Sequence, residues 1–410
     1  MCYTQNRFKA LLSACALSLI ATAGWSQSLT WLGTLGGVRS EAYGVSADGA
    51  VVVGMAENAA GQPRAFRWTA SGGMQDLGDL GGGESWAQGV SADGAVVVGW
   101  SYSLAAEYYR AFRWTASGGM QDLGTLPGSV YSLALGVSAD GSVVVGWAEN
   151  AAQHPRAFRW TASGGMQGLG TLGGDESEAR GVSADGSVVV GGALDADWQW
   201  LAFRWTASGG MQDLGALRGG YSYAYGVSAD GSVVVGQFAS GWYRAFRWQN
   251  GVMQDLGTLG GRYSWAYGVS ADGAVVVGEA HNALGQSRAF RWTASGGMEN
   301  LNTTYASLLT NGSQLSVARA ISPDGRYIVG WGTSPATGQY EAFLLDTGPR
   351  CTTHNGDVDA NGCVDDADLL AVLFAFGQTG SNLGRVDVNC DGAVDDADLL
   401  QVLFNFGSGC

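Results

Sequence analysis

Short apolar segments and polar turns alternate over residues 29–345. In one representative unit, EAYGVS (41–46) is followed by the turn SADG and then AVVVG (50–54), while RAFRWT (64–69) is followed by ASGG and MQDLGDL (74–80). Consecutive apolar residues such as VVV are typical of a strand buried on both faces, and Asp and Gly favour tight turns. The pattern therefore predicts four strands in each unit.

The unit occurs seven times. GVSADGAVVVG at 44–54 returns at 89, 136, 181, 226 and 268, and in altered form as AISPDGRYIVG at 320. The spacings between copies are 45, 47, 45, 45, 42 and 52 residues, which is close to the length of one propeller blade. Residues present in every copy, such as Asp48, or in six of the seven, such as Arg67, are expected to be structural because every repeat must pack on the next.

The fourth strand of the unit is offset along the chain. A first copy, LTWLGTL (29–35), precedes all the hairpins, and none follows the last third strand, AFLL (342–345). The N-terminal strand can therefore complete the last blade and remove the open sheet edges. The sequence predicts an all-β, seven-bladed β-propeller over 27–349, closed by its N-terminal strand and monomeric.

Composition and charge narrow the class of protein. The chain holds 67 glycines together with many aromatic and β-branched residues, which excludes a disordered or collagen-like chain. The net charge is −15, and residues 351–410 hold ten Asp and one Arg. A chain without a basic patch is not expected to bind nucleic acid, whereas the acidic C-terminal segment indicates a cation site.

The N-terminus has the pattern of a secretion signal. Arg7 and Lys9 precede the apolar run ALLSACALSLIATAG, and ATA offers a cleavage site, so we expect residues 1–26 to be removed on export to the cell surface or the extracellular space. LSAC, ending at Cys15, is the alternative of a lipoprotein signal. No later stretch is apolar over a membrane-spanning length. Four cysteines of the C-terminal segment predict two disulfides with three alternative pairings: Cys351, Cys363, Cys390 and Cys410.

Residues 350–410 contain two acidic loops of twelve residues, DVDANGCVDDAD (357–368) and DVNCDGAVDDAD (387–398). Oxygen ligands at loop positions 1, 3, 5, 9 and 12, a carbonyl at position 7 and Gly at position 6 form the pattern of a calcium loop. An acidic linker would not need this spacing. The sequence predicts two calcium ions, bound by these residues: Asp357, Asp359, Asn361, Cys363, Asp365 and Asp368, then Asp387, Asn389, Asp391, Ala393, Asp395 and Asp398.

Each loop is followed by an apolar segment with helical spacing, ADLLAVLFAFG and ADLLQVLFNFG, so each is half of an EF-hand. Residues 356–407 resemble a type I dockerin. That resemblance implies folding by calcium and a cohesin domain as partner, bound at positions matching Asp366–Ala367 and Asp396–Ala397. Many dockerins carry hydroxyl residues at those positions. A rigid unit for surface retention or sorting is therefore the alternative.

The propeller units resemble the HAF family of extracellular repeats over about residues 29–345. The resemblance rests on RAFRW at 64, 110, 156, 244 and 288, LAFRW at 201, and LGTLGG at 32, 169 and 256. SPDGRYIV (322–329) also resembles the hairpin of Tol-type propellers. The HAF resemblance implies an exported protein and no defined activity.

Function is expected where the copies differ. The SADG and TASGG turns lie at one end of the propeller, which we call the uniform face, and the other connections form the variable face at the opposite end. Variable loops on a rigid scaffold commonly carry function. A Ser-x-Ala-x-Gly motif places candidate ligand-binding aromatics here, unless half of them pack between blades: Trp86, Tyr223, Tyr225, Trp265 and Tyr267.

Aromatic rings beside polar groups suit sugar rings, so a polysaccharide or cell-surface glycan is expected ahead of a protein ligand. The chain has three histidines and no local Ser/His/Asp or Cys/His pattern. The sequence therefore favours a non-catalytic recognition or scaffold protein. The alternative is a secreted polysaccharide-degrading enzyme, a glycoside hydrolase or lyase, carried by a dockerin, with acid pairs such as Asp175/Glu176 or Asp195/Asp197.

Overall fold

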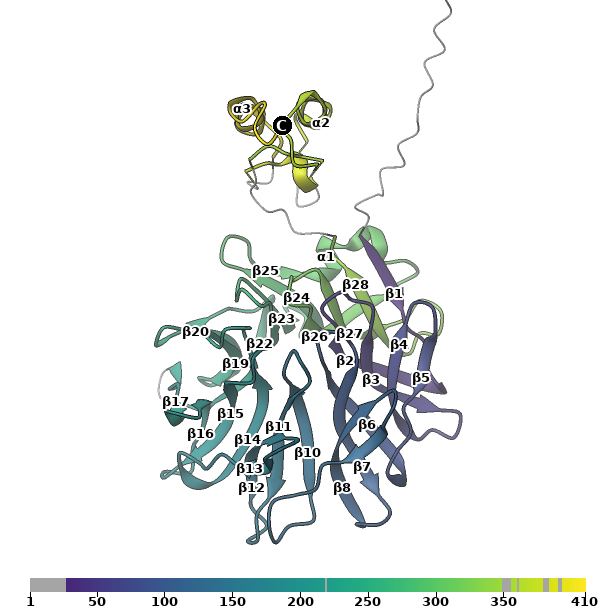
Figure 1. The fold of residues 1–410 in the computed structure, drawn as a ribbon, viewed down its shortest axis with the longest axis vertical. Coiled ribbons are helices and arrows are strands. Elements are labelled where there is room, and N and C mark those ends of the chain that lie inside the picture. The colour runs from purple at the N-terminus through teal and green to yellow at the C-terminus, as the bar shows by residue number, and fades with distance from the viewer. Residues whose placement is uncertain (1–26, 218–219, 349–354, 360, 379–382, 390–392) are drawn as a thin grey trace, which may run out of the picture.

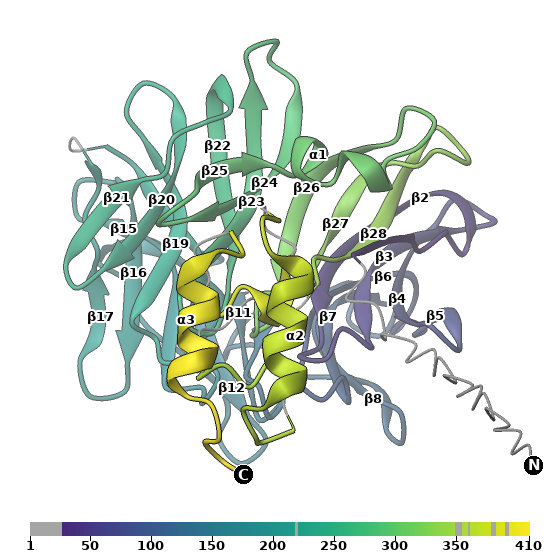
Figure 2. The ribbon, with the colours of Figure 1, turned by 90° about the horizontal axis from the view of Figure 1, so that it is seen from above.

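The computed structural model describes residues 27–217, 220–348, 355–359, 361–378, 383–389 and 393–410. Within them, seven antiparallel sheets of four strands surround a central axis, as Figures 1 and 2 show. The chain is thus a seven-bladed β-propeller, with short helices near its C-terminus.

The four strands of a blade follow one another outward from the axis. The innermost strands are β2 Gly36–Val45, β6 Gly81–Val90, β10 Ser132–Val137, β14 Gly173–Val182, β18 Ser222–Val227, β22 Gly260–Val269 and β26 Gln314–Ile321. The second strands are β3 Val52–Asn58, β7 Val96–Ser103, β11 Val143–Glu149, β15 Val188–Asp195, β19 Val233–Ala239, β23 Val275–Asn282 and β27 Tyr327–Thr333.

The third strands are β4 Pro63–Thr69, β8 Tyr108–Thr115, β12 Pro155–Thr161, β16 Trp200–Thr206, β20 Tyr243–Gln249, β24 Ser287–Thr293 and β28 Tyr340–Asp346. The outermost strands are β5 Gly73–Asp76, β9 Gly119–Asp122, β13 Gly165–Gly168, β17 Gly210–Asp213, β21 Val252–Asp255, β25 Gly297–Asn300 and β1 Ser28–Trp31. Outer strands are shorter than the sequence predicts, because the Asp76 carboxylate accepts the Gly78 N–H (2.8 Å) and turns the chain.

The N-terminal strand closes the ring, as predicted. β1 pairs antiparallel with β28, with Leu29 opposite Leu345, and the purple strand lies beside the green seventh blade in Figure 1. The Leu32 N–H continues the ladder to the Ala342 carbonyl (2.9 Å). The last sheet is therefore built from both ends of the propeller sequence.

The repeated apolar residues form the core between blades. The side chain of Phe66, the aromatic residue of RAFRW, is fully buried and packs with Val52 of the VVVG segment. Gly54 ends that segment because a Cβ there would lie 1.9 Å from the Glu41 carbonyl oxygen. The repeat sequence therefore encodes both the burial of each sheet and the close approach of its two inner strands.

In six of the seven blades, a buried serine joins the blade to the one before it. The Ser85 hydroxyl accepts the Ala65 N–H (2.9 Å) and donates to the Gly78 carbonyl (2.7 Å), and Ser40, Ser132, Ser177, Ser222 and Ser264 bond in the same way. The repeated arginine adds a second link, since Arg67 donates to the Gly94 carbonyl of the next blade. These contacts confirm the structural role expected for the repeated polar residues.

The hairpin turns form a chain of hydrogen bonds around the uniform face. The Ala47 N–H donates to the Ala92 carbonyl (2.9 Å), and the pattern continues from blade to blade until the Ala271 N–H donates to the Pro323 carbonyl (2.9 Å). Pro323 has no N–H and so donates no further bond. The near identity of the turns thus follows from their mutual pairing.

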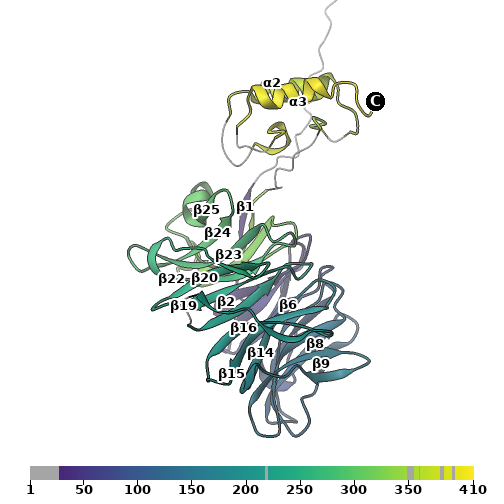
Figure 3. The same cartoon turned by 90° about the vertical axis from the view of Figure 1, so that its left-hand side faces the viewer.

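The C-terminal unit consists of two helices, α2 Asp366–Ala375 and α3 Asp396–Phe404, which lie side by side in Figures 2 and 3. The short helices α1 Leu301–Thr304, η2 Ala306–Leu308 and η3 Gly384–Val386 complete the helical elements of the described residues. No helix in these residues has the length and apolar character needed to cross a membrane.

The two halves of the C-terminal unit hold each other reciprocally. Val364 of the first loop exchanges backbone hydrogen bonds with Gly407 and Ser408 after α3, at 2.8 and 3.0 Å. Val394 of the second loop makes the same pair of bonds after α2, with Gly377 and Gln378. A disulfide joins Cys363 to Cys410. The other two predicted disulfide residues, Cys351 and Cys390, lie outside the described residues, as does the predicted signal at 1–26.

Candidate functional site

The two faces of the propeller differ in the apolar side chains that they expose. Among its described residues, Val252 is the one exposed large hydrophobic side chain on the uniform face. The others all lie on the variable face: Val38, Leu104, Tyr108, Val130, Trp198, Trp242, Tyr243, Leu284 and Tyr340. The two faces, which the sequence distinguishes by the variation of their connections, therefore also differ in how much apolar surface they expose.

The innermost strands enclose a central channel of about 240 Å³. Its lining forms three rings of residues. The middle ring consists of small residues, mostly glycines such as Gly44. It separates an apolar ring, which includes Val45 and Ile321, from a polar ring. The polar ring lies toward the variable face: Tyr43, Gln88, Leu135, Arg180, Tyr225, Tyr267 and Arg319. The Ser-x-Ala-x-Gly motif therefore places its second variable residue at the mouth of the channel.

Arg180 in the polar ring has close partners. It donates to the Glu178 carboxylate (2.9 Å) and to the Tyr223 hydroxyl (3.2 Å), and that hydroxyl itself donates to Glu178 (2.5 Å). Burial raises the pKa of Tyr223 well above its ordinary value, so the phenol is neutral. Arg180, Glu178 and Tyr223 therefore form a closed network without net charge.

Arg319 occupies the same ring in a different way. Its guanidinium lies 4.5 Å from the centre of the Tyr267 ring, and it has no ion pair or hydrogen bond with any described residue. The Tyr267 hydroxyl donates to Glu279 (3.4 Å), and the Tyr43 hydroxyl donates to Glu41. Burial raises the pKa of Tyr43, Tyr225 and Tyr267, so neutral phenols surround this cation.

The five aromatic residues predicted to bind a ligand fall into two groups. Tyr225 and Tyr267 line the channel. Trp86 and Trp265 are half-buried in stacks on the variable side of their blades, and Tyr223 is 5% exposed. Packing between blades, the alternative given above, thus accounts for Tyr223, whose hydroxyl positions Arg180.

Aromatic rings stack within two separate blades. Trp86 of β6 lies face to face with its cross-strand partner Trp100 of β7, with ring centres 3.8 Å apart, and Tyr109 contacts both edge to face. Trp265 stacks on Tyr263, and His281 lies at the edge of both rings. Each stack leaves part of its aromatic surface at the variable face.

Trp198 stands out among the exposed rings; the sequence places it among the aromatic residues of the variable face, but it is not one of the five candidate ligand-binding residues. Its side chain is 66% exposed, and its backbone has φ +62. The N–H of Trp198 donates to the carbonyl three residues earlier, as those of Gly61, Gln153 and Gly285 do in their blades. Two of these loops use glycine at this left-handed position, where a bulky residue is strained. The comparison of the four loops is the signal that could have found it.

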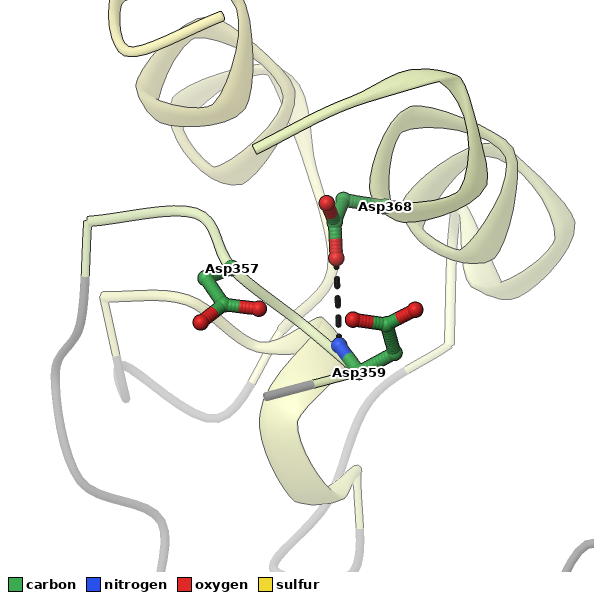
Figure 4. A group of neighbouring side chains, drawn as sticks. All are labelled: Asp357, Asp359 and Asp368. Atoms are coloured by element: carbon green, nitrogen blue, oxygen red, sulfur yellow. Dashed lines mark hydrogen bonds between the residues drawn. The ribbon is translucent and has the colours of Figure 1, made fainter. Parts of the chain in front are cut away.

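Part of the predicted calcium site assembles in the first acidic loop. One carboxylate oxygen from each of Asp357, Asp359 and Asp368 lies within 4.8 Å of the other two. Figure 4 shows how the three side chains are grouped. Asp368 is fully buried and accepts the N–H groups of Val358 (2.6 Å) and Asp359 (3.1 Å). The loop thus directs three carboxylates at one point.

The other predicted ligands of this loop have local roles. Asp365 caps α2 by accepting the Ala367 N–H (2.8 Å), and the Asn361 oxygen accepts the Cys363 N–H (2.8 Å). Cys363, predicted to supply a carbonyl, carries the disulfide to Cys410.

The second loop repeats this arrangement where it is described. Asp387 and Asp398 are buried, and Asp398 accepts the N–H groups of Asn389 (3.1 Å) and Asp395 (2.9 Å). Asp395 caps α3 as Asp365 caps α2. Ala393 precedes the buried Val394. The remaining predicted ligand, Asp391, lies outside the described residues.

The donor set of the first loop fits a calcium ion. Three converging carboxylates repel one another unless a cation lies between them. Arg385 lies beside the cluster, where it donates to the backbone carbonyls of Asp357 and Val358. Hard oxygen donors at this spacing suit Ca²⁺. Gly362 at φ +92 provides the sharp turn that the loop needs.

The two helices expose apolar side chains at matching positions. Phe374 and Phe404 are 85% and 84% exposed, and Leu370 and Leu400 are also exposed, whereas Val372 and Val402 are buried between the helices. Exposed apolar patches of this kind are typical of binding surfaces.

One acid of the pairs named for catalysis and two of the three histidines have local structural contacts. Asp195 accepts the N–H groups of Asp197 and Gln199 and so shapes its loop. His154 donates its backbone N–H to Asn150 (3.1 Å), and His281 belongs to an aromatic stack.

Among the comparisons with known proteins, only the search of solved structures finds similar proteins. No family model matches the chain, and no curated protein matches it. The crystal structure of TolB from Acinetobacter baumannii aligns with TM-score 0.44 and 12% identity, covering 74% of this chain and 65% of that one. The structure of putative TolB from Agrobacterium tumefaciens aligns with TM-score 0.41 and 14% identity, covering 75% and 90%. The seven-bladed assignment itself rests on the pairing of the strands described above.

Proposed function

We propose that this chain is an exported, non-catalytic recognition protein whose propeller binds a glycan on its variable face. The C-terminal unit binds two calcium ions and holds the protein in an extracellular assembly. Export is supported by the Cys363–Cys410 disulfide, because disulfides persist in oxidising compartments, and by the signal-like sequence of residues 1–26.

The observation that carries the proposal is the exposed aromatic surface around a polar channel mouth. Exposed rings such as Trp198 and Trp242 lie on this face, together with the half-exposed stacks of Trp86 and Trp265. Aromatic faces pack against sugar rings, and nearby polar groups orient sugar hydroxyls. Trp198 supports this role further, because its exposed ring is kept at a position with a strained backbone.

The proposed role of the C-terminal unit follows from its two sets of features. The convergence of Asp357, Asp359 and Asp368 supports calcium binding. The exposed Phe374 and Phe404 support contact with a protein partner, for which a cohesin domain is the proposed candidate. If no such partner binds, the same unit would serve as a rigid retention module.

A polysaccharide array probed with Trp198→Gly tests the glycan proposal. Glycine suits φ +62, and the exposed ring buries little area, so the variant should be at least as stable as the parent chain. Loss of a stacking ring should weaken binding about tenfold, which corresponds to roughly 1.4 kcal/mol. The full-length chain is used throughout, and the same wells are assayed for released reducing ends.

Gln153→Gly is the matched control, because Gln153 occupies the same loop position in another blade with φ +64. It should gain stability in the same way and keep its binding. If Trp198→Gly binds the polysaccharide as tightly as the parent chain does, the proposal that the variable-face loops form the binding site would be contradicted. Release of reducing ends would instead establish the polysaccharide-degrading alternative.

A further inference from the structure

The channel contains a cation without a partner. In the polar ring, Arg180 is neutralised by Glu178, whereas Arg319 has no carboxylate or hydrogen-bond acceptor among the described residues. A guanidinium presents five N–H donors, and those of Arg319 are half-buried at the mouth of the channel without an acceptor among the described residues. An anion from outside the chain would supply the missing acceptors.

The carboxylates nearest to this ring are already in use. Glu41 accepts from Arg39 and from the Tyr43 hydroxyl, and both oxygens of Glu279 accept hydroxyl groups, from Tyr267 and Ser287. None of these carboxylates forms an ion pair with Arg319 in the part of the chain that the structure describes. Glu279 keeps its negative charge on the far side of the Tyr267 hydroxyl, but it makes no ion pair with Arg319, so the guanidinium N–H groups of Arg319 stay available to a ligand in the channel.

The surroundings of Arg319 select the kind of anion. One unpaired cation balances a single negative charge, which favours a carboxylate over a phosphate dianion. The neutral phenols of Tyr225 and Tyr267 and the amide of Gln88 line the same ring and suit sugar hydroxyls and a sugar face. The volume of about 240 Å³ is below the range of roughly 300–1,000 Å³ typical of drug-sized ligands, so the channel suits one terminal group.

We propose that Arg319 binds the carboxylate of an acidic sugar at the end of a glycan, with the sugar ring in the polar ring of the channel. This inference rests on the glycan-binding function proposed above and names the substrate class. The exposed aromatic surface would bind the neutral sugars of the glycan, and the channel would bind its acidic terminal sugar.

The test compares trimers of galacturonate, mannuronate and glucuronate with their carboxyl-reduced, neutral counterparts, using the full-length chain at one fixed calcium concentration. At least one acidic trimer should bind tenfold or more tightly than its neutral counterpart. Arg319→Gln should abolish that difference by weakening the binding of the acidic trimer at least tenfold, and Arg319→Lys should restore part of it.

The control is Arg326→Gln, which removes the same charge from the same blade at the uniform face, where Arg326 pairs with Asp346. It should bind both trimers like the parent chain, and tryptophan fluorescence under urea should show both glutamine variants folded. Equal binding of acidic and neutral trimers would overturn the role of Arg319 while leaving the glycan proposal intact. Failure of every trimer to bind would overturn both.

Discussion

At the residue scale, the repeated Ser and Asp of the SADG turns act within the turn. In the third blade the Ser138 hydroxyl donates to Asp140 (2.6 Å), and the same carboxylate accepts the Ser142 N–H (3.0 Å). The hydrogen bond from Ser138, followed by those from Ser142, lowers the pKa of Asp140 to about 2. The repeated aspartate is therefore a structural acid rather than a functional one.

We expect this acid to make the propeller sensitive to low pH. Asp140, Asp185 and Asp230 have a pKa of about 2 when folded, against about 3.9 when unfolded. A lowered pKa stabilises the fold above pH 4, and this contribution is lost as the pH falls from about 4 to about 2. The urea midpoint, followed by tryptophan fluorescence, should fall over this interval.

The sixteen tryptophans all precede residue 350, so the fluorescence signal reports on the propeller without the C-terminal unit. Replacing the three aspartates together by asparagine should make the dependence on pH shallower between 4 and 2. An unchanged slope in that triple variant would mean that other acids control acid unfolding.

At the element scale, each acidic loop is fixed by the helix that it starts and by the end of the other helix. Asp365 caps α2, while Val364 next to it bonds to Gly407 and Ser408 after α3. We therefore expect a calcium ion in one loop to order both helices. This coupling explains why two short helices that expose large apolar side chains can hold together.

Removing one ligand should remove one of two calcium ions. For Asp357→Asn we expect titration calorimetry to show one tight site instead of two, with the first loop weakened at least tenfold, because a carboxylate is lost from the cluster. The helical circular dichroism signal should then need more calcium to recover after chelation.

Asp366→Asn provides the matched control, since Asp366 is exposed in the first turn of α2 and lies outside the cluster. It should retain two sites. If chelation leaves the helical signal of the parent chain unchanged, the calcium assignment of both loops is wrong.

At the scale of the whole molecule, the ring depends on one short strand. β1 supplies the fourth strand of the last blade, and its Trp31 ring packs edge to face on Phe343 of β28. Without it, β28 would become an exposed edge, and the first and last blades would lose a shared strand.

Thr30→Pro should open this closure, because proline cannot pair normally within a ladder, and Thr30 has an exposed side chain whose loss costs little packing. We expect a loss of about 2–3 kcal/mol in the free energy of unfolding and more aggregation, measured by urea titration and light scattering. Thr30→Ala, which keeps the backbone donor, should change the stability by less than about 1 kcal/mol. Equal effects of the two substitutions would contradict the role of β1 pairing.

Much of the fold and part of the site could be read from the sequence. The offset of LTWLGTL against the hairpins indicated a ring closed by β1, and the alternation of constant and variable connections placed Tyr225 and Tyr267 near the channel. The burial of Tyr223 could not be predicted from the sequence. The side chain at this position of the motif projects from the surface in some blades and packs between blades in others, depending on its neighbours. The pairing of Cys363 with Cys410 was likewise one of three alternatives until the two loops were placed together.

By itself, the sequence determined the number of blades, the strands of each blade and the residues that turn them, because these depend on short-range patterns repeated seven times. Only the tertiary structure decided which polar side chains find partners. Arg180 and Arg319 occupy the same motif position in different blades, yet one meets Glu178 and the other faces the channel unpaired. The Glu178 contact is local, since Glu178 lies two residues before Arg180 on the same strand. The Tyr223 hydroxyl that completes the network comes from the adjacent blade, 43 residues from Arg180, and it reaches Arg180 because the packing of the blades brings the two strands together.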